Sequence, residues 1–216
     1  MIGFGLKPGG DTFRVLCLGA HSDDIEIGCG GTILSLREKY QNIEFQWVVL
    51  NAVGVRGGEA RQAATLFAGS ALREITLKSF PDGFMPYVGS EVKTAFEQLK
   101  QSPSPDLILC PWRDDAHQDH RLVSEWTWNT FRYHLILEYE IPKYDGDMGR
   151  PNIFVPLEEV QYRKKIENLF DAFQSQHSKP WLEESTFLSL MRLRGMESNS
   201  PTRYAEAFHC RKLILG

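Results

Sequence analysis

The chain has 216 residues, of which 42% are hydrophobic and 24% are charged, a balance that is typical of globular proteins and excludes a disordered chain. No apolar run approaches the ~20 residues of a membrane-spanning helix, so we expect no membrane span. The formal net charge is −4 and no basic run stands out, so we expect no nucleic-acid partner.

We expect one domain over residues 1–216, in which residues 1–12 form a flexible N-terminal tail. The first ten residues hold no apolar stretch long enough for a signal peptide, which makes cytoplasmic residence the default expectation. The cysteines are widely spaced and form no C-x-x-C pair. We interpret all four as reduced structural thiols: Cys17, Cys29, Cys110 and Cys210.

Strand and helix patterns alternate through the first half of the chain. Short apolar runs predict buried strands at 13–20, 45–50, 75–80 and 106–111, and helical spacing predicts helices at 33–40, 59–68 and 91–100. A glycine-rich turn, 28–32, precedes the first helix, and Pro81-Asp82-Gly83 stops the third strand. This alternation predicts right-handed βαβ units around a parallel sheet.

The second half of the chain is less regular. We expect helices at 122–133, 157–176 and 186–194, and strands at 135–141 and 205–215. Residues 143–156 are expected to form a loop around a short apolar stretch, 153–155. Neither a repeat nor a linker between domains is evident.

The segment A-H-S-D-D-I-E-I-G-C-G-G-T, residues 20–32, begins where the first expected strand ends. Ligands of open α/β sheets bind at the carboxyl ends of strands, where His21, Asp23 and Asp24 lie. Two adjacent carboxylates repel each other, so keeping both there favours a bound cation or proton. A histidine with a carboxylate is typical of zinc sites. The alternative interpretation is a turn whose aspartates cap the next helix.

A second segment, D-D-A-H-Q-D-H-R, residues 114–121, follows the fourth expected strand. In a doubly wound sheet that strand lies beside the first, so both segments reach the same edge. If the segment opens a helix, His117 and His120 share one face at spacing i, i+3. The alternative is a helix cap with solvated histidines. Two His–Asp clusters at one sheet edge favour a metal site.

The two motifs together resemble those of the PIG-L/LmbE-like N-deacetylases, a family with A-H-P-D-D-E near the N-terminus and H-x-D-H in the middle. Weaker similarity continues over nearly the whole chain, through Arg56-Gly57-Gly58-Glu59, Phe80-Pro81-Asp82-Gly83, Pro105-Asp106-Leu107-Ile108, Ser175-Gln176 and Ala205-Glu206-Ala207-Phe208. The resemblance implies an α/β fold that is Rossmann-like, with three αβα layers around a largely parallel sheet. It also implies a divalent metal, usually zinc, and the removal of acetyl groups from N-acetylated sugars.

The resemblance assigns the metal ligands and the base by motif position. His21, Asp24 and His120 would hold the metal and leave one coordination position open for water. Asp23 would be the general base that takes a proton from that water. Zinc is the expected metal, and such a donor set also accepts Fe²⁺, Co²⁺ or Mn²⁺.

Two further residues receive catalytic roles from the resemblance. His117 would stabilise the oxyanion or protonate the leaving amine, and Asp119 would fix its orientation. The sequence departs from the family pattern at Ser22, where proline is common, and at Ile25, where glutamate is common, with Glu26 one position later. None of these is a ligand in the family, so the implied chemistry is unchanged.

Three residues are candidates for contacts with the substrate. Arg56 would reach a polar substrate group, and an exposed arginine is the alternative. Asp82 would bind substrate hydroxyls, or be a plain turn aspartate. Trp112 would stack on a sugar face, or pack in the core.

The glycine cluster of Gly28, Gly30 and Gly31 lacks the G-x-G-x-x-G spacing of dinucleotide-binding loops. We interpret these glycines as positions where the first helix packs closely on its neighbours. The remaining histidines have no metal-like neighbours in the sequence and are interpreted as structural or solvated: His134, His177 and His209.

The leading hypothesis is a zinc-dependent amidohydrolase that deacetylates a small N-acetylated sugar or glycoconjugate. One alternative is a conjugate amidase that cleaves a larger amide at the same site. Another is a non-catalytic protein that binds a nucleotide or a sugar phosphate, although a pure binder needs no base beside a metal. The sequence does not set the oligomeric state, and a homo-oligomer is compatible with it.

Overall fold

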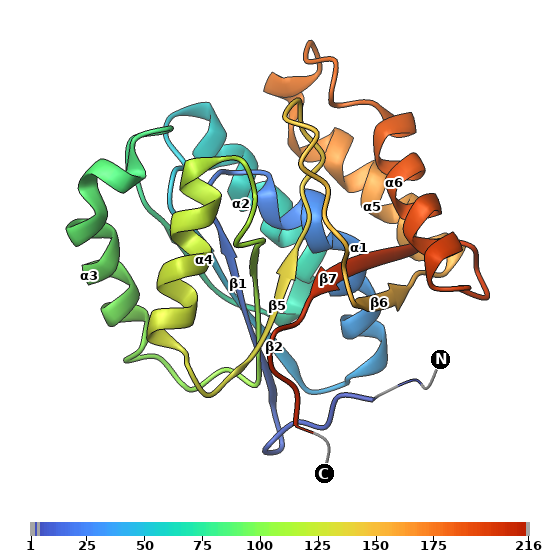
Figure 1. Ribbon diagram of the computed structural model, residues 1–216, viewed down its shortest axis with the longest axis horizontal. Helices are drawn as coiled ribbons and strands as arrows, with labels where there is room; N and C mark the ends of the chain where they lie inside the picture. Colours follow the sequence, from blue (N-terminus) through green and yellow to red (C-terminus); the bar gives the residue numbers. More distant parts are fainter. Residues whose placement is uncertain (1–2, 4, 215–216) are drawn as a thin grey trace.

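A seven-stranded sheet with the order β3-β2-β1-β4-β5-β7-β6 forms the centre of the protein (Figure 1). The computed structural model describes residue 3 and residues 5–214. Its strands are β1 (Phe13–Gly19), β2 (Ile43–Val49), β3 (Leu72–Leu77), β4 (Leu107–Pro111), β5 (Leu135–Tyr139), β6 (Ile153–Pro156) and β7 (Ala205–His209). Strands β1 to β5 are mutually parallel, and β7 runs antiparallel to both of its neighbours, β5 and β6.

Helices cover both faces of this sheet. They are α1 (Asp24–Lys39), α2 (Val55–Ala68), α3 (Gly89–Leu99), α4 (Gln118–Thr130), α5 (Glu159–Ala172) and α6 (Glu184–Glu197), with short 3₁₀ turns η1 (Gly69–Ala71), η2 (Met85–Val88) and η3 (Gln174–Gln176). Helices α1, α2 and α5 pack together on one face, and α3 packs with α4 on the other (Figure 1). The predicted three-layer α/β fold is therefore confirmed.

Alternation along β1 explains why the sheet is buried on both sides. Val15 and Cys17 belong to the apolar core under α1, α2 and α5, whereas Leu16 and Leu18 belong to the core under α3 and α4. Successive strand residues point to opposite faces, so a continuous apolar run suits a strand with helices on both sides.

The four cysteines are free thiols, as predicted.

Helix α1 begins nine residues earlier than the predicted helix 33–40 and contains the predicted glycine turn 28–32. The glycines permit close packing, as expected: a Cβ at Gly28 would overlap the ring of Tyr139, and one at Gly30 would overlap Phe67. The helix is broken at Cys29, whose φ of −144° and ψ of 18° are not helical. The glycines therefore belong to a helix that bends between its two halves.

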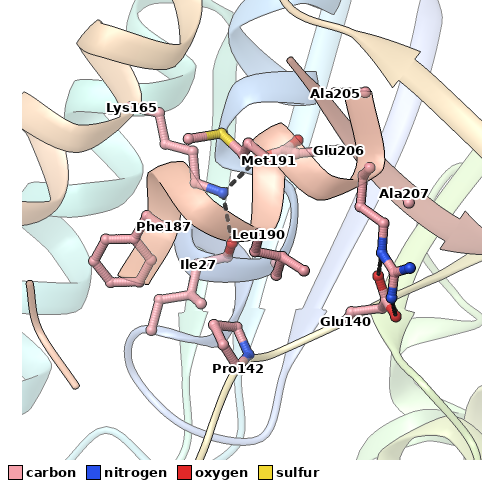
Figure 2. A pocket seen from close by; sticks show the side chains of 12 residues that line it. Ile27, Glu140, Pro142, Lys165, Phe187, Leu190, Met191, Ala205, Glu206 and Ala207 are labelled. Carbon is pink, nitrogen blue, oxygen red and sulfur yellow. Dashed lines mark hydrogen bonds and ion pairs between the residues drawn. The ribbon is translucent and has the colours of Figure 1, made fainter. Parts of the chain in front are cut away.

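Side chains from distant elements replace the hydrogen bonds lost at this break. The N–H groups of Gly31 and Thr32 donate to the two carboxylate oxygens of Glu206 at 2.9 and 2.6 Å. Lys165 Nζ donates at 2.6 Å both to the Ile27 carbonyl and to Glu206 (Figure 2). Because Ile27 O would be the helical partner of Gly31 N–H, Lys165 and Glu206 together satisfy both groups.

Several predicted boundaries are wrong. Helix 122–133 starts earlier and ends at Thr130, and helix 157–176 divides into α5 and η3. The predicted loop 143–156 contains β6, an edge strand too short to show a periodicity of its own. The predicted strand 205–215 ends at His209, and its last residue lies outside the described residues.

The described part of the N-terminal segment lies close to the start of β4. Part of the predicted flexible tail 1–12 lies outside the described residues, and its described part is bonded to the sheet through Gly9 N–H, which donates to Asp106 at 2.9 Å. Among the helices of the described residues, none is both long and apolar enough to cross a membrane.

Candidate active site

The two His–Asp motifs meet at the carboxyl edge of the sheet, as predicted. Strands β1 and β4 are parallel neighbours, with Val15 paired to Leu107. The chain after β1 carries His21, and the loop after β4 leads into α4, which carries His120. The imidazole nitrogens of these histidines, 99 positions apart, lie 3.1 Å from each other.

The three expected metal ligands form a compact group of donors. His120 Nε2 lies 3.4 Å from Asp24 Oδ1, and His21 Nδ1 lies 3.6 Å from Asp24 Oδ2. Two imidazole nitrogens and a carboxylate oxygen converging in this way are the donors of a three-ligand zinc site with an open position. The chemistry of the donor set therefore fits a divalent metal.

Carboxylates hold the outward-facing nitrogen of each histidine. His120 Nδ1 lies 3.0 Å from Asp115 Oδ2, and His21 Nε2 lies 3.1 Å from Asp82 Oδ1 and 3.3 Å from Asp119 Oδ2. Such contacts fix the orientation of a metal-binding imidazole and increase its basicity. Asp115 was missed by the sequence analysis, although it lies inside the second motif.

The carboxylates around these donors favour positive charge at the two histidines. Burial disfavours a charged His21, but Asp24, Asp119 and Asp82 outweigh burial and raise its pKa to about 12. Burial likewise opposes charge on His120, while Asp24 and Asp115 raise its pKa to about 9. A divalent cation bound between these donors would supply that positive charge in place of protons.

His117 is the N-cap residue of α4 and lies beside both ligand histidines. Its ring centroid is 4.7 Å from those of His21 and His120. The Asp119 backbone N–H donates to His117 Nδ1 at 3.2 Å, so the proton of a neutral imidazole resides on Nε2. Burial and the two neighbouring histidines lower the pKa of His117, which keeps the ring neutral.

Asp119 contacts His117 through its backbone, and its carboxylate has other partners. That carboxylate accepts from Gly83 N–H at 2.7 Å and Met85 N–H at 3.2 Å, and it faces His21 instead. Asp119 reaches His117 only through its backbone N–H among the hydrogen bonds of the described residues. It therefore links the turn after β3 to the ligand cluster.

Asp23 faces away from its neighbour Asp24. Its Oδ2 lies 2.8 Å from Arg56 Nη2, and Arg56 Nη1 lies 2.9 Å from Glu59 Oε2. Glu59 in turn accepts from Ser175 N–H at 2.7 Å and from Ser175 Oγ at 2.8 Å. Burial raises the pKa of Asp23, and Arg56 opposes that rise. Arg56 thus holds the Asp23 carboxylate in position, and Glu59 and Ser175 hold Arg56.

A cleft of about 670 Å³ opens beside these residues. Its lining includes His21, Asp23, His117, Arg56 and Asp82, together with Gln176 of the Ser175-Gln176 segment. Asn51 and Lys179, which the sequence analysis did not single out, also line it. The volume falls in the range of small-molecule sites.

Trp112 does not belong to this lining. Its ring stacks on His209 at 4.4 Å with 9° between the planes, and Gly149 lies against it. Of the three predicted substrate-binding residues, the structure therefore brings Arg56 and Asp82 into the cleft and places Trp112 elsewhere.

Groups of donors that include His117 also converge here. His21, His117 and His120 offer nitrogens within 4.8 Å of one another, as do His21, Asp82, His117 and Asp119 with their nitrogens and oxygens. His117 thus borders the donor group that contains Asp24, on the side that faces the cleft.

Similar proteins are known from sequence and from structure. The diacetylchitobiose deacetylase of Thermococcus kodakarensis is 27% identical over 131 residues, which are 53% of this chain and 48% of the relative, so this chain spans about half the length of that relative. The N,N'-diacetylchitobiose deacetylase of Pyrococcus horikoshii, solved with an inhibitor, has a TM-score of 0.72 at 19% identity, covering 93% of this chain and 84% of its own.

The same fold also occurs in a protein whose name specifies a different reaction. The 4-carboxy-2-hydroxymuconate hydratase GalB of Pseudomonas putida KT2440 has a TM-score of 0.70 at 16% identity, covering 95% of this chain and 98% of its own. Similarity at these identities establishes the fold and leaves the reaction to the site. Residues 16–131 match the PIG-L family, described as GlcNAc-PI de-N-acetylase, and with both of its motifs inside that match the chain belongs to this family.

Proposed function

We propose that this protein is a zinc-dependent amidohydrolase that removes the N-acetyl group from an amino sugar or a sugar-containing metabolite. The observation that carries the proposal is the convergence of His21, Asp24 and His120 beside a cleft that the Asp23 carboxylate and the His117 imidazole also line. The relatives whose names specify N-acetylated sugars support the choice of substrate class.

His21, Asp24 and His120 would hold the metal, which would supply Lewis acidity and lower the pKa of a bound water. Asp23 Oδ1 or Oδ2 accepts a proton from the attacking water, while Arg56 at 2.8 Å holds the carboxylate in place. This assigns different tasks to two aspartates that are adjacent in sequence.

His117 acts on the acetyl carbonyl in the proposed reaction. With Nδ1 occupied by a backbone N–H, its Nε2–H is free to donate to the oxygen of the acetyl carbonyl as negative charge develops there. The carbon–nitrogen bond then breaks, the amine takes up the proton removed from water, and acetate and a free amino sugar leave.

The test is a panel of N-acetylated monosaccharides, nucleotide sugars and glycosides incubated with protein that contains one equivalent of zinc. We expect equimolar release of acetate and primary amine from at least one of them, and no release from the Asp24→Ala variant. Amine without acetate from larger amides would indicate the conjugate amidase instead. Binding of sugar phosphates without any product would indicate the non-catalytic alternative and overturn the proposal.

The identity of the metal has its own measurement. Protein purified without chelators is expected to contain close to one equivalent of zinc by elemental analysis. Iron, cobalt or manganese at that stoichiometry would revise the metal and keep the site, whereas the absence of any divalent metal, with no uptake on titration, would refute the site.

A further inference from the structure

A second pocket, of about 580 Å³, lies along α4 and shares no lining residue with the catalytic cleft. We call it the basic pocket and define it by its lining: Arg113, Arg121, Glu125, Trp128, Asn129, Arg132, Arg211 and Lys212. Its residues come from the loop after β4, from α4 and the turn that follows it, and from the segment after β7, shown in red in Figure 1.

The lining combines five cationic side chains with a single carboxylate, that of Glu125. In the part of the chain that the structure describes, Arg113 lies 4.0 Å from Asp114, and no Asp or Glu approaches the charged nitrogens of the other four cations within 4.0 Å. Beneath the pocket, Glu138 is fully buried, and burial raises its pKa. Arg113 and Arg211 oppose this rise, and the five cations still outnumber the carboxylates of Glu125 and Glu138, which costs electrostatic repulsion.

Other contacts hold these side chains in place. Arg121 Nη1 donates at 2.8 Å to the carbonyl of Asp115, and Arg132 Nε donates at 3.2 Å to that of Asn129. The Arg211 guanidinium lies 4.4 Å from the centre of the Trp128 ring. These contacts restrain the arginines without neutralising them, so their charge remains available for an anion.

We propose that the basic pocket binds a small anion that carries two or more phosphate or sulfate groups. Guanidinium groups match the geometry of these oxyanions, and the pocket has the volume of a small-molecule site. The pocket lining carries five positive charges and one negative charge, whereas the formal net charge of the whole chain is −4. Because the positive charge is concentrated around this one pocket, it favours a compact ligand over a long polyanion such as nucleic acid.

The test uses pyrenetetrasulfonate, a fluorescent small tetra-anion, titrated into the zinc-containing protein at low salt. We expect saturable binding of one equivalent, displaced by fructose 1,6-bisphosphate and not by N-acetylglucosamine. In the double variant Arg132→Gln/Arg211→Gln the dissociation constant is expected to rise at least tenfold, with the melting temperature and the deacetylase rate unchanged.

The matched control is Arg61→Gln/Arg163→Gln, which removes the same charge from two exposed arginines on α2 and α5. An equal loss of affinity in the control would show that only net charge matters and would overturn the pocket assignment. Stronger binding of single-stranded RNA than of the small anions, or displacement by N-acetylglucosamine, would overturn it as well. So would the absence of binding at low salt.

Discussion

Asp23 and Asp24 are adjacent in the chain, yet their carboxylates face different partners. Asp24 lies 3.4 Å from His120, whereas Asp23 lies 2.8 Å from Arg56. Neighbouring side chains at the start of a helix point about 100° apart, so one pair of residues can serve a metal and a base separately. Substitution at each position should therefore produce distinct defects.

Asp23→Asn should keep the metal and lose activity by about 10² to 10⁴-fold, the usual contribution of a general base. Asp24→Ala should lose the metal, because it removes one of three donors. Elemental analysis and steady-state rates on the same preparations check both expectations. Asp23→Asn protein that is fully active, or that is inactive only through metal loss, would contradict the assignment.

His117→Ala should lower kcat by roughly 10²-fold or more, the effect of removing one oxyanion donor. Because the Nε2–H donates to the carbonyl oxygen in our proposal, the loss should be similar for an N-acetyl amide and for an activated acetate ester. Comparing the two substrates is the measurement. A loss confined to the amide would instead assign His117 to protonation of the leaving amine.

His209 should make the folded protein less stable in mild acid than at neutral pH. Burial and nearby Arg194 lower its pKa to about 4, so between pH 6.5 and 4 the unfolded chain binds a proton that the folded protein refuses. Stability therefore falls as the pH drops through this window. His209→Gln should reduce the fall by on the order of 1 kcal/mol, a value discounted for partial exposure, in urea unfolding at pH 7 and pH 4.5. Identical pH dependence in both proteins would contradict this.

The proximity of the three candidate ligands could be predicted from the sequence because His21, Asp24 and His120 lie in short motifs at the ends of two strands. Contacts between distant segments could not. The stacking of Trp112 on His209 depends on β7 pairing with β5, which no local pattern reveals. The contacts of Asp115 and Asp119 with the candidate ligand histidines depend on the directions of these side chains, which sequence spacing alone does not determine.

At the scale of elements, the broken helix α1 joins the catalytic edge to the rest of the protein. Its first half carries Asp24, and its second half is capped by Glu206 from β7. A glycine run in the sequence suggested a turn, because glycine disfavours helices. The helix forms nevertheless, since packing and the Glu206 cap outweigh this propensity. Strands β1, β2, β4 and β5 were predicted well because their apolar runs are largely buried.

Glu206→Ala should destabilise the protein by about 3–5 kcal/mol, because it leaves the 2%-exposed Lys165 ammonium without its carboxylate. The double variant Glu206→Ala/Lys165→Met should be more stable than Glu206→Ala alone, since it removes the buried unpaired charge. Urea unfolding of the unsubstituted protein, Glu206→Ala, Lys165→Met and the double variant gives the free energy of unfolding of each. A cost below about 1 kcal/mol for Glu206→Ala, or no recovery in the double variant, would contradict the role of the pair.

At the scale of the whole molecule, the candidate metal site joins parts of the chain that pack on opposite faces of the sheet. His21 and Asp24 lead into α1, and His120 lies on α4. An ion bound by all three donors binds the folded state alone, so it stabilises the entire domain.

Zinc at about a thousand times its dissociation constant should raise the melting temperature by roughly 8–16 °C for a domain of this size. Asp23→Asn should show the same rise, and Asp24→Ala should show little of it. Thermal unfolding with and without zinc, after removal of metal by a chelator, measures the effect. An undiminished rise in Asp24→Ala would place the stabilising metal elsewhere.

The cap on α1 also has a consequence for synthesis on the ribosome. Thr32 and its partner Glu206 are 174 positions apart, so at ~5–20 residues per second the carboxylate is made roughly 9–35 s after the helix that it caps. Until then the second half of α1 lacks its carboxylate cap, and the sheet lacks β7 between β5 and β6. The helix that carries Asp24 is therefore fully capped only after β7 has been translated, although the two His–Asp motifs lie within the first 120 residues.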